Sequence, residues 1–159
     1  MGLRFKDQNL GQCFFVTTTF KNHQAFGKNS EFLTSIANSL DFCANKYQGK
    51  IAAYCLMPTH IHLLIFIEGN KLSSFMRDFK KFTAQKVSRD YGFLTDSLWM
   101  PRYDRVAIFS EEVFYKKLEY IHNNPIKANL VENAADWAWS SAGDYLSSGT
   151  GIIPVWKDW

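Results

Sequence analysis

The sequence lacks long hydrophobic runs, and this absence excludes membrane-spanning segments. The longest apolar stretch covers about seven residues, 61–67, with one histidine inside it. A transmembrane helix needs roughly 20 apolar residues. The first ten residues are polar and charged, so we also expect no signal peptide. We therefore expect a cytoplasmic protein without a membrane partner.

Cysteine is also scarce. The three cysteines, Cys13, Cys43 and Cys55, are an odd number, and no two of them have CxxC spacing. A disulfide framework uses cysteines in pairs, and common zinc sites use closely spaced pairs. We interpret the three side chains as reduced thiols that fill the core.

Neither sign of charge is in large excess, because the net charge is only +3. Basic side chains are nevertheless concentrated in the middle of the chain. Residues 71–130 carry 11 basic and 7 acidic side chains, whereas residues 131–159 carry 1 and 4. A basic middle segment fits a nucleic-acid surface, although solvated helix faces would give the same counts.

Apolar and aromatic residues are abundant and make up 47% and 16% of the 159 residues. This composition predicts one folded domain with a buried core. We expect a single domain over residues 1–159, with a core at about 11–130 and an aromatic tail at 131–159. The tail aromatics are predicted to pack on the body rather than to stack on bases: Trp137, Trp139, Tyr145, Trp156 and Trp159.

The pattern of apolar residues predicts strands alternating with helices. Strands are expected at 13–20, 50–57 and 60–67 and near the end of 98–109. Helices are expected at 30–47, 72–91 and 111–124, with caps at Ser30 and Ser110 and a stop at Pro125. The apolar side of the second helix is expected to contain Leu72, Phe75, Met76, Phe79, Phe82 and Val87.

This order matches the ferredoxin-like plan, which RRM domains share. It predicts an α+β fold with a four-stranded antiparallel sheet, two helices on one face and the third long helix on the other. The fold plan by itself does not give a function.

Two histidines stand inside the strand predicted at 60–67. Residues two apart point to the same face of a strand, so His60 and His62 lie side by side while Ile61 points to the other face. Their Cβ atoms are then roughly 6–7 Å apart, and both imidazoles can reach one cation. Two hydrogen-bonded histidines at a strand end are the alternative. A zinc site with one of the cysteines is disfavoured by the spacing.

The helix at 111–124 carries polar residues beside its apolar stripe. At about 100° per residue, Tyr120, Asn124 and Lys117 share one strip at the edge of the stripe, whereas Tyr115 points elsewhere. The stripe consists of Phe114, Leu118 and Ile121. If the helix covers the sheet, the strip can face the histidine pair. A phenol with an ordinary pKa of about 10 is a poor nucleophile, but beside a metal-bound phosphate it could attack phosphorus. A water-exposed tyrosine at the helix edge is the alternative.

Four segments resemble a known family. HIH at 60–62 resembles the HUH motif, in which U is any hydrophobic residue. YIHNNPIKANLV at 120–131 resembles the tyrosine helix of single-tyrosine HUH transposases. LWMPRYDRV at 98–106 and WSSAGDYL at 139–146 resemble REP-associated tyrosine transposases in particular. Relatives often have glycine where this chain has Asn129, a residue that tolerates a left-handed backbone.

The resemblance implies a ferredoxin-like enzyme that nicks single-stranded DNA next to an imperfect hairpin. It implies that Tyr120 becomes linked to a 5′-phosphate and releases a 3′-hydroxyl. His60, His62 and Asn124 would hold Mg²⁺ or Mn²⁺. The enzyme would act as a monomer or a homodimer.

The sequence offers several basic residues as DNA contacts, and two alternative functions fit the same pattern of elements. Candidate phosphate contacts are Lys80, Lys81, Arg102, Arg105 and Lys117. A non-catalytic RRM-like module that binds single-stranded nucleic acid is one alternative. A replication-initiator type of HUH nickase is another, and the short chain favours the transposase.

Overall fold

The structure, a computed structural model, describes residues 12–92 and 97–159. The segment that predicts the lack of a signal peptide lies outside these residues. The strands are β1 (Cys13–Thr19), β2 (Lys50–Leu56), β3 (His60–Phe66) and β4 (Asp104–Ile108). The helices are α1 (Ser30–Lys46), α2 (Gly69–Tyr91), α3 (Glu111–Lys127) and α4 (Ala142–Leu146). Three short 3-10 helices are η1 (Lys21–His23), η2 (Phe26–Lys28) and η3 (Ala134–Asp136). No helix of the described chain is both long and apolar enough to cross a membrane.

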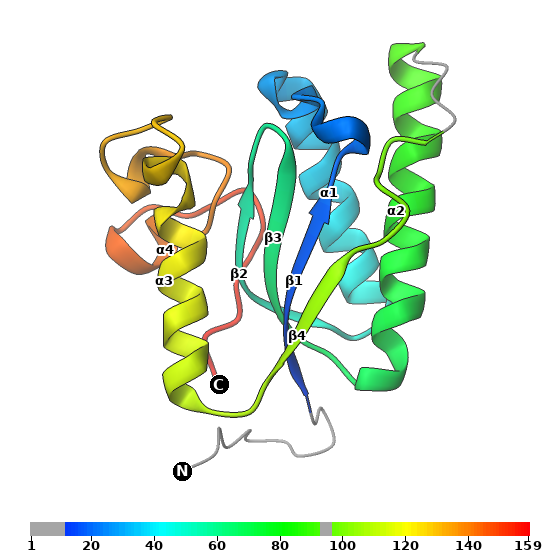
Figure 1. The fold of residues 1–159 in the computed structure, drawn as a ribbon. Helices are drawn as coiled ribbons and strands as arrows, with labels where there is room; N and C mark the ends of the chain where they lie inside the picture. Colours follow the sequence, from blue (N-terminus) through cyan, green and yellow to red (C-terminus); the bar gives the residue numbers. More distant parts are fainter. Residues whose placement is uncertain (1–11, 93–96) are drawn as a thin grey trace.

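The four strands form one antiparallel sheet in the order β2-β3-β1-β4. Helices α1 and α2 cover one face, and α3 with the C-terminal segment lies on the other (Figure 1). This is the predicted ferredoxin-like architecture. It places the first and third strands in the centre of the sheet, so β3 and its histidines lie between two paired neighbours.

The alternation along β3 separates two hydrophobic cores. Ile61, Leu63 and Ile65 belong to the core beneath α1 and α2. Leu64 and Phe66 belong to the smaller core beneath α3. Because side chains alternate across a strand, the histidines lie on the α3 side, as the sequence predicts.

One apolar residue of α2 was placed on the wrong side by the sequence pattern. Phe82 is 42% exposed, beside the exposed ring of Phe42 at 6.0 Å between centroids. The buried face passes through Thr83 instead, whose Oγ1 accepts a hydrogen bond of 2.8 Å from Trp99 Nε1. Periodicity alone predicted that Phe82 is buried, but Thr83 is the buried residue and bonds to the Trp99 indole.

Two predicted helix ends are corrected. The cap of α1 is Asn29, whose side chain accepts from Phe32 N, rather than Ser30. Helix α3 does not stop at Pro125 but continues to Lys127 with the proline inside it. Proline removes one backbone donor, but here it lies in the last turn and is buried. The chain then turns at Asn129, which has the left-handed φ of 57°. The other predicted cap, Ser110, accepts from Val113 N.

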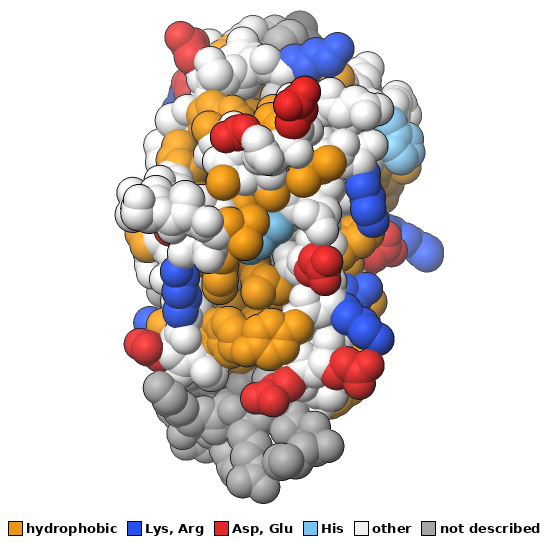
Figure 2. Space-filling model, turned by 90° about the vertical axis from the view of Figure 1, so that its left-hand side faces the viewer, with side chains coloured by type: hydrophobic (Ala, Val, Ile, Leu, Met, Phe, Trp, Pro, Cys, Tyr) orange, Lys and Arg blue, Asp and Glu red, His pale blue; other side chains and the backbone are white. Residues whose placement is uncertain are grey.

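The C-terminal segment packs on the body and covers the open edge of β2. Backbone bonds join Leu56 N to Trp139 O at 2.8 Å and Trp156 N to Ile51 O at 2.8 Å. The tail aromatics pack against the two cores or bond to β2, which confirms their packing role: Trp137, Trp139, Tyr145, Trp156 and Trp159. Figure 2 shows this side of the molecule, where apolar side chains gather between charged ones. An uncovered strand edge would be free to pair with another chain, so the tail protects β2.

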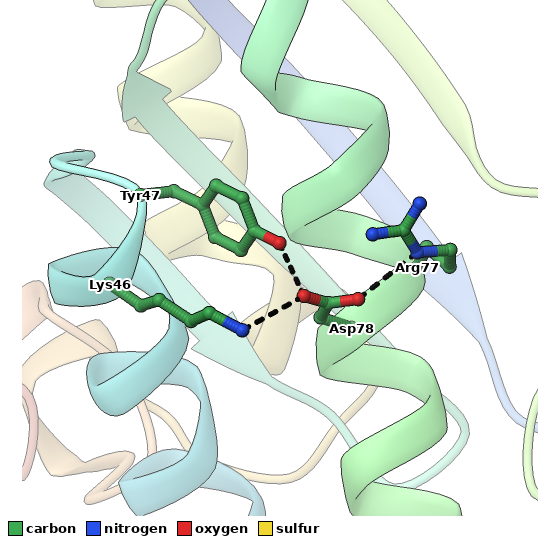
Figure 3. Close-up of polar contacts among 4 residues, drawn as sticks. All are labelled: Lys46, Tyr47, Arg77 and Asp78. Atoms are coloured by element: carbon green, nitrogen blue, oxygen red, sulfur yellow. Dashed lines mark hydrogen bonds and ion pairs between the residues drawn. The ribbon is translucent and has the colours of Figure 1, made fainter.

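Helices α1 and α2 are connected by a polar cluster on their outer side (Figure 3). The Asp78 carboxylate accepts hydrogen bonds from the Tyr47 hydroxyl, from Lys46 Nζ at 3.1 Å and from Arg77 Nε at 3.0 Å. These donors hold the pKa of Asp78 well below its usual range, the Tyr47 bond contributing most. The Asp78 side chain is 25% exposed, so solvent screens part of the interaction.

We expect Asp78→Asn to lower the melting temperature at neutral pH. The folded-state pKa of Asp78 is depressed, so its contribution is present above the unfolded pKa of about 3.9 and is lost as pH falls below it. The difference between wild type and variant should therefore be full near pH 7 and shrink below about pH 4. Thermal unfolding followed by circular dichroism at several pH values measures this. A difference that grows towards acid pH would contradict the assignment.

Candidate active site

The two histidines of β3 meet at their outer nitrogens. His60 Nε2 lies 3.0 Å from His62 Nε2. His60 Nδ1 lies 2.9 Å from Thr59 Oγ1, and His62 Nδ1 lies 2.9 Å from Thr17 Oγ1. When each Nδ1–H donates to its threonine oxygen, both Nε2 atoms present lone pairs to the same point. Such outer hydrogen bonds set the tautomer and orientation of metal-binding histidines.

Helix α3 brings an amide to this point. Asn124 Nδ2 lies 3.2 Å from His62 Nε2. A half-turn of the amide exchanges its nitrogen for Oδ1, and an amide oxygen is a type of atom that can coordinate a divalent cation. The sequence-predicted set of His60, His62 and Asn124 is thus brought together from β3 and α3.

The geometry fits a small divalent cation. An octahedral Mg²⁺ lies about 2.1 Å from each ligand, so adjacent ligand atoms are about 3.0 Å apart. The His60–His62 separation matches this value. Among the described residues, no three His, Cys, Asp or Glu side chains form a metal-binding group. This finding gives no support to the zinc alternative, and Asn124 stays the predicted third ligand.

Burial favours the neutral form of both imidazoles. Desolvation lowers the pKa of His62 to about 3, with smaller contributions from His60 and Lys117. Desolvation also lowers the pKa of His60, an effect that the nearby His23 reinforces and a hydrogen bond with Asn124 opposes. A neutral imidazole offers the lone pair that a metal ligand needs.

Tyr120 lies at the rim of the same cluster. Its ring centroid is 5.3 Å from that of His62 and 5.9 Å from that of Phe15, in edge-to-face arrangements. The side chain is 40% exposed, so its hydroxyl is not enclosed by the core. Lys117 Nζ and Lys127 Nζ lie 5.9 Å and 5.3 Å from the tyrosine ring centroid. The phenol, the cluster of His60, His62 and Asn124, and two ammonium groups therefore lie together at one accessible place.

Comparison with known proteins identifies the family. The sequence model of the family described as "Transposase IS200 like" matches residues 11–124. The chain belongs to this family. Transposases cut and rejoin DNA, so the chain belongs to an enzyme class rather than to the RRM-like binding modules.

Individual proteins similar to this IS200-like transposase are also described as transposases. A REP-associated tyrosine transposase of Escherichia coli strain K12 is 26% identical over 155 residues, covering 94% of this chain and 85% of the relative. A solved structure of a REP-associated tyrosine transposase bound to a REP hairpin superposes with a TM-score of 0.74. That structure is 21% identical and covers 100% of this chain and 94% of its own, and it confirms the fold.

The predicted DNA-contacting residues lie in three places in this IS200-like transposase. Lys117 lies at the site, with Nζ 4.7 Å from the Phe15 ring centroid. Arg102 and Arg105 are exposed at β4 and the loop before it. Lys80 and Lys81 are on α2, across the sheet from the histidines, and Lys80 Nζ donates to Met100 O at 2.7 Å. Lys80 thus has a structural partner, while DNA contacts of all five residues stay predictions.

Two residues beside the site, Phe15 and Lys127, and one buried residue outside it, His122, were not predicted from the sequence. Phe15 stacks on His62 at 5.5 Å between centroids, and Lys127 lies beyond the predicted end of the helix. His122 is buried, and its Nε2 lies 2.8 Å from Ser141 Oγ, which also accepts from Tyr54 N. This contact connects α3 to β2 through the C-terminal segment. Only the strand register and the position of the tail reveal these contacts.

Proposed function

We propose that this IS200-like transposase nicks and rejoins single-stranded DNA next to an imperfect hairpin, with Tyr120 as the nucleophile. His60, His62 and Asn124 would hold Mg²⁺ or Mn²⁺. The observation that carries the proposal is the 3.0 Å convergence of the two imidazoles beside the tyrosine ring.

In the proposed step, the Tyr120 phenol loses its proton to solvent and its oxygen forms a bond to phosphorus. The bond from phosphorus to the 3′-oxygen of the preceding nucleotide breaks, and that oxygen takes up a proton. The products are a 5′-phosphotyrosine and a free 3′-hydroxyl. The hydroxyl can reverse the step on the same or another strand, which rejoins DNA.

The charges around the site support binding of a phosphate. Bound by the three ligands, a divalent cation would supply positive charge that withdraws electron density from the scissile phosphate. Lys117 and Lys127 flank the tyrosine ring and would hold the anionic backbone there. The partial exposure of Tyr120 would let a flexible strand approach its hydroxyl.

The hairpin substrate is proposed from the relatives. One similar protein was solved bound to a REP hairpin, and the shared fold allows the same kind of DNA here. Base-paired DNA is stiff, whereas an unpaired strand can bend into a site between a sheet and a helix.

We therefore expect a covalent adduct with single-stranded DNA only. Labelled hairpin oligonucleotides with unpaired flanks should give a slower band on denaturing gels in Mn²⁺. A fully paired duplex of the same sequence should give at least about tenfold less adduct. Binding of the oligonucleotide without any adduct would support a non-catalytic binding module and overturn the proposed function.

A further inference from the structure

A hollow outside the metal-binding cluster opens on the same face of the sheet. Its volume is about 340 Å³, within the range of ~300–1,000 Å³ in which proteins hold small ligands. It is lined by Thr17, Thr19, His23, Met100, Pro101, Arg102, Tyr103 and Asp104. Neither the metal ligands nor the tyrosine line it.

The strand register places this hollow beside the candidate active site. Thr17 pairs with His62 on one side and with Asp104 on the other, and Thr19 pairs with His60. Directly paired residues point to the same face, and neighbouring strands are ~4.8 Å apart. Thr17 Oγ1 also contacts His62 Nδ1 at 2.9 Å. The hollow thus begins one strand away from the imidazoles.

The lining combines flat apolar surface with unpartnered charge. Met100, Pro101 and the Tyr103 ring provide surface against which a planar group can stack. Arg102 and Asp104 have exposed side chains, and within the described residues neither has an ion pair or side-chain hydrogen bond. Stacking surface, a hydrogen-bond acceptor and a guanidinium together suit a nucleotide.

The wall of the hollow is fixed by the protein itself. Lys80 Nζ donates to Met100 O at 2.7 Å and lies 5.9 Å from the Tyr103 ring centroid. Met100 N donates to Thr19 O at 2.8 Å. His23, which lines the hollow, and its neighbour Asn22 have left-handed φ values of 54° and 55°. Strained non-glycine residues of this kind cluster at ligand-binding sites.

We propose that this hollow binds one unpaired base of the DNA strand next to the phosphate that Tyr120 attacks, and so selects the sequence that is cleaved. The proposal rests on the proposed function. The Tyr103 ring stacks on the base, the Asp104 carboxylate accepts from an N–H on its edge, and Arg102 contacts the adjoining phosphate.

The first test measures binding without cleavage. Fluorescent hairpin oligonucleotides, each with one unpaired nucleotide made abasic, are titrated with the protein in EDTA and followed by anisotropy. One position should lose roughly 5- to 100-fold in affinity, the range measured for one stacked base. Tyr103→Leu, which keeps an apolar side chain of useful size, should lose as much on intact DNA and should not respond to the abasic change at that position.

A matched control is Phe42→Leu, which replaces an exposed aromatic residue on α1. It should keep the wild-type affinity and the wild-type response to the abasic position. The proposal is overturned if wild type tolerates an abasic nucleotide at every unpaired position. It is also overturned if Tyr103→Leu responds like wild type.

Asp104→Asn provides a second test that does not depend on packing, because this side chain is exposed. It should leave the melting temperature unchanged and should alter the ranking of the four bases at the sensitive position only. Adduct formation that does not depend on the base at that position would overturn the proposed base pocket and leave the proposed function intact. Binding that depends on the base, without any adduct, would support the pocket and overturn the proposed function.

Discussion

Tyr120→Phe should abolish the covalent protein–DNA adduct, a loss of at least about 10³-fold, because a covalent nucleophile has no substitute. Phenylalanine keeps the ring that contacts His62 and Phe15, so folding and binding of the hairpin oligonucleotide should persist. Denaturing electrophoresis after incubation with labelled hairpin DNA and Mn²⁺ measures the adduct. Anisotropy on the same oligonucleotide measures binding.

Tyr115→Phe is the matched control on the same helix. Tyr115 is 52% exposed, and its ring lies 5.6 Å from that of Trp159 rather than near the histidines. This variant should form the adduct at close to the wild-type rate. An adduct that survives in Tyr120→Phe and disappears in Tyr115→Phe would show that Tyr115 is the nucleophile and would overturn the proposed site.

Replacing both histidines, His60→Ala with His62→Ala, should reduce cleavage by at least about 100-fold, an effect typical of losing metal ligands. The fold should persist, because the two side chains lie at one end of β3 and other residues make up both hydrophobic cores. Calorimetric titration with Mn²⁺ gives a readout that is independent of cleavage. Wild type should bind the metal, and the double variant should not.

His122→Ala separates loss of metal from loss of stability. His122 is also a buried histidine, but it bonds to Ser141 instead of the His60–His62 pair. Its removal should lower the melting temperature by a few degrees, consistent with a buried hydrogen bond worth about 1 kcal/mol, and should preserve Mn²⁺ binding. Cleavage by wild type that continues unchanged in EDTA would show that the metal role is wrong.

The sequence predicted β3 well because its signal is local. Alternation with a period of two separates Ile61 from the histidines whatever the strand pairs with, and the structure has the two faces as predicted. The 100° spacing likewise placed Tyr120 and Asn124 on one strip of α3, and both lie beside His62.

Predictions failed where a distant segment decides the outcome. Phe82 has the spacing expected for the buried side of α2, but it is exposed, and Thr83 is buried there instead with a hydrogen bond from the distant Trp99. Pro125 is a good stop signal, yet packing keeps it inside α3. His122 borders the predicted stripe on the side opposite Tyr120, at about 40° from Leu118 on the helix, and it is buried where the C-terminal segment covers it.

By itself, the sequence determined the order of elements, the faces of β3 and the strip of α3, because periodicity is a property of consecutive residues. Only the tertiary structure decided that Phe15 and Thr17 stand against His62, that Lys127 reaches Tyr120 and that a hollow adjoins the histidines. These contacts depend on strand register and helix docking, which are set by packing between residues far apart in the chain.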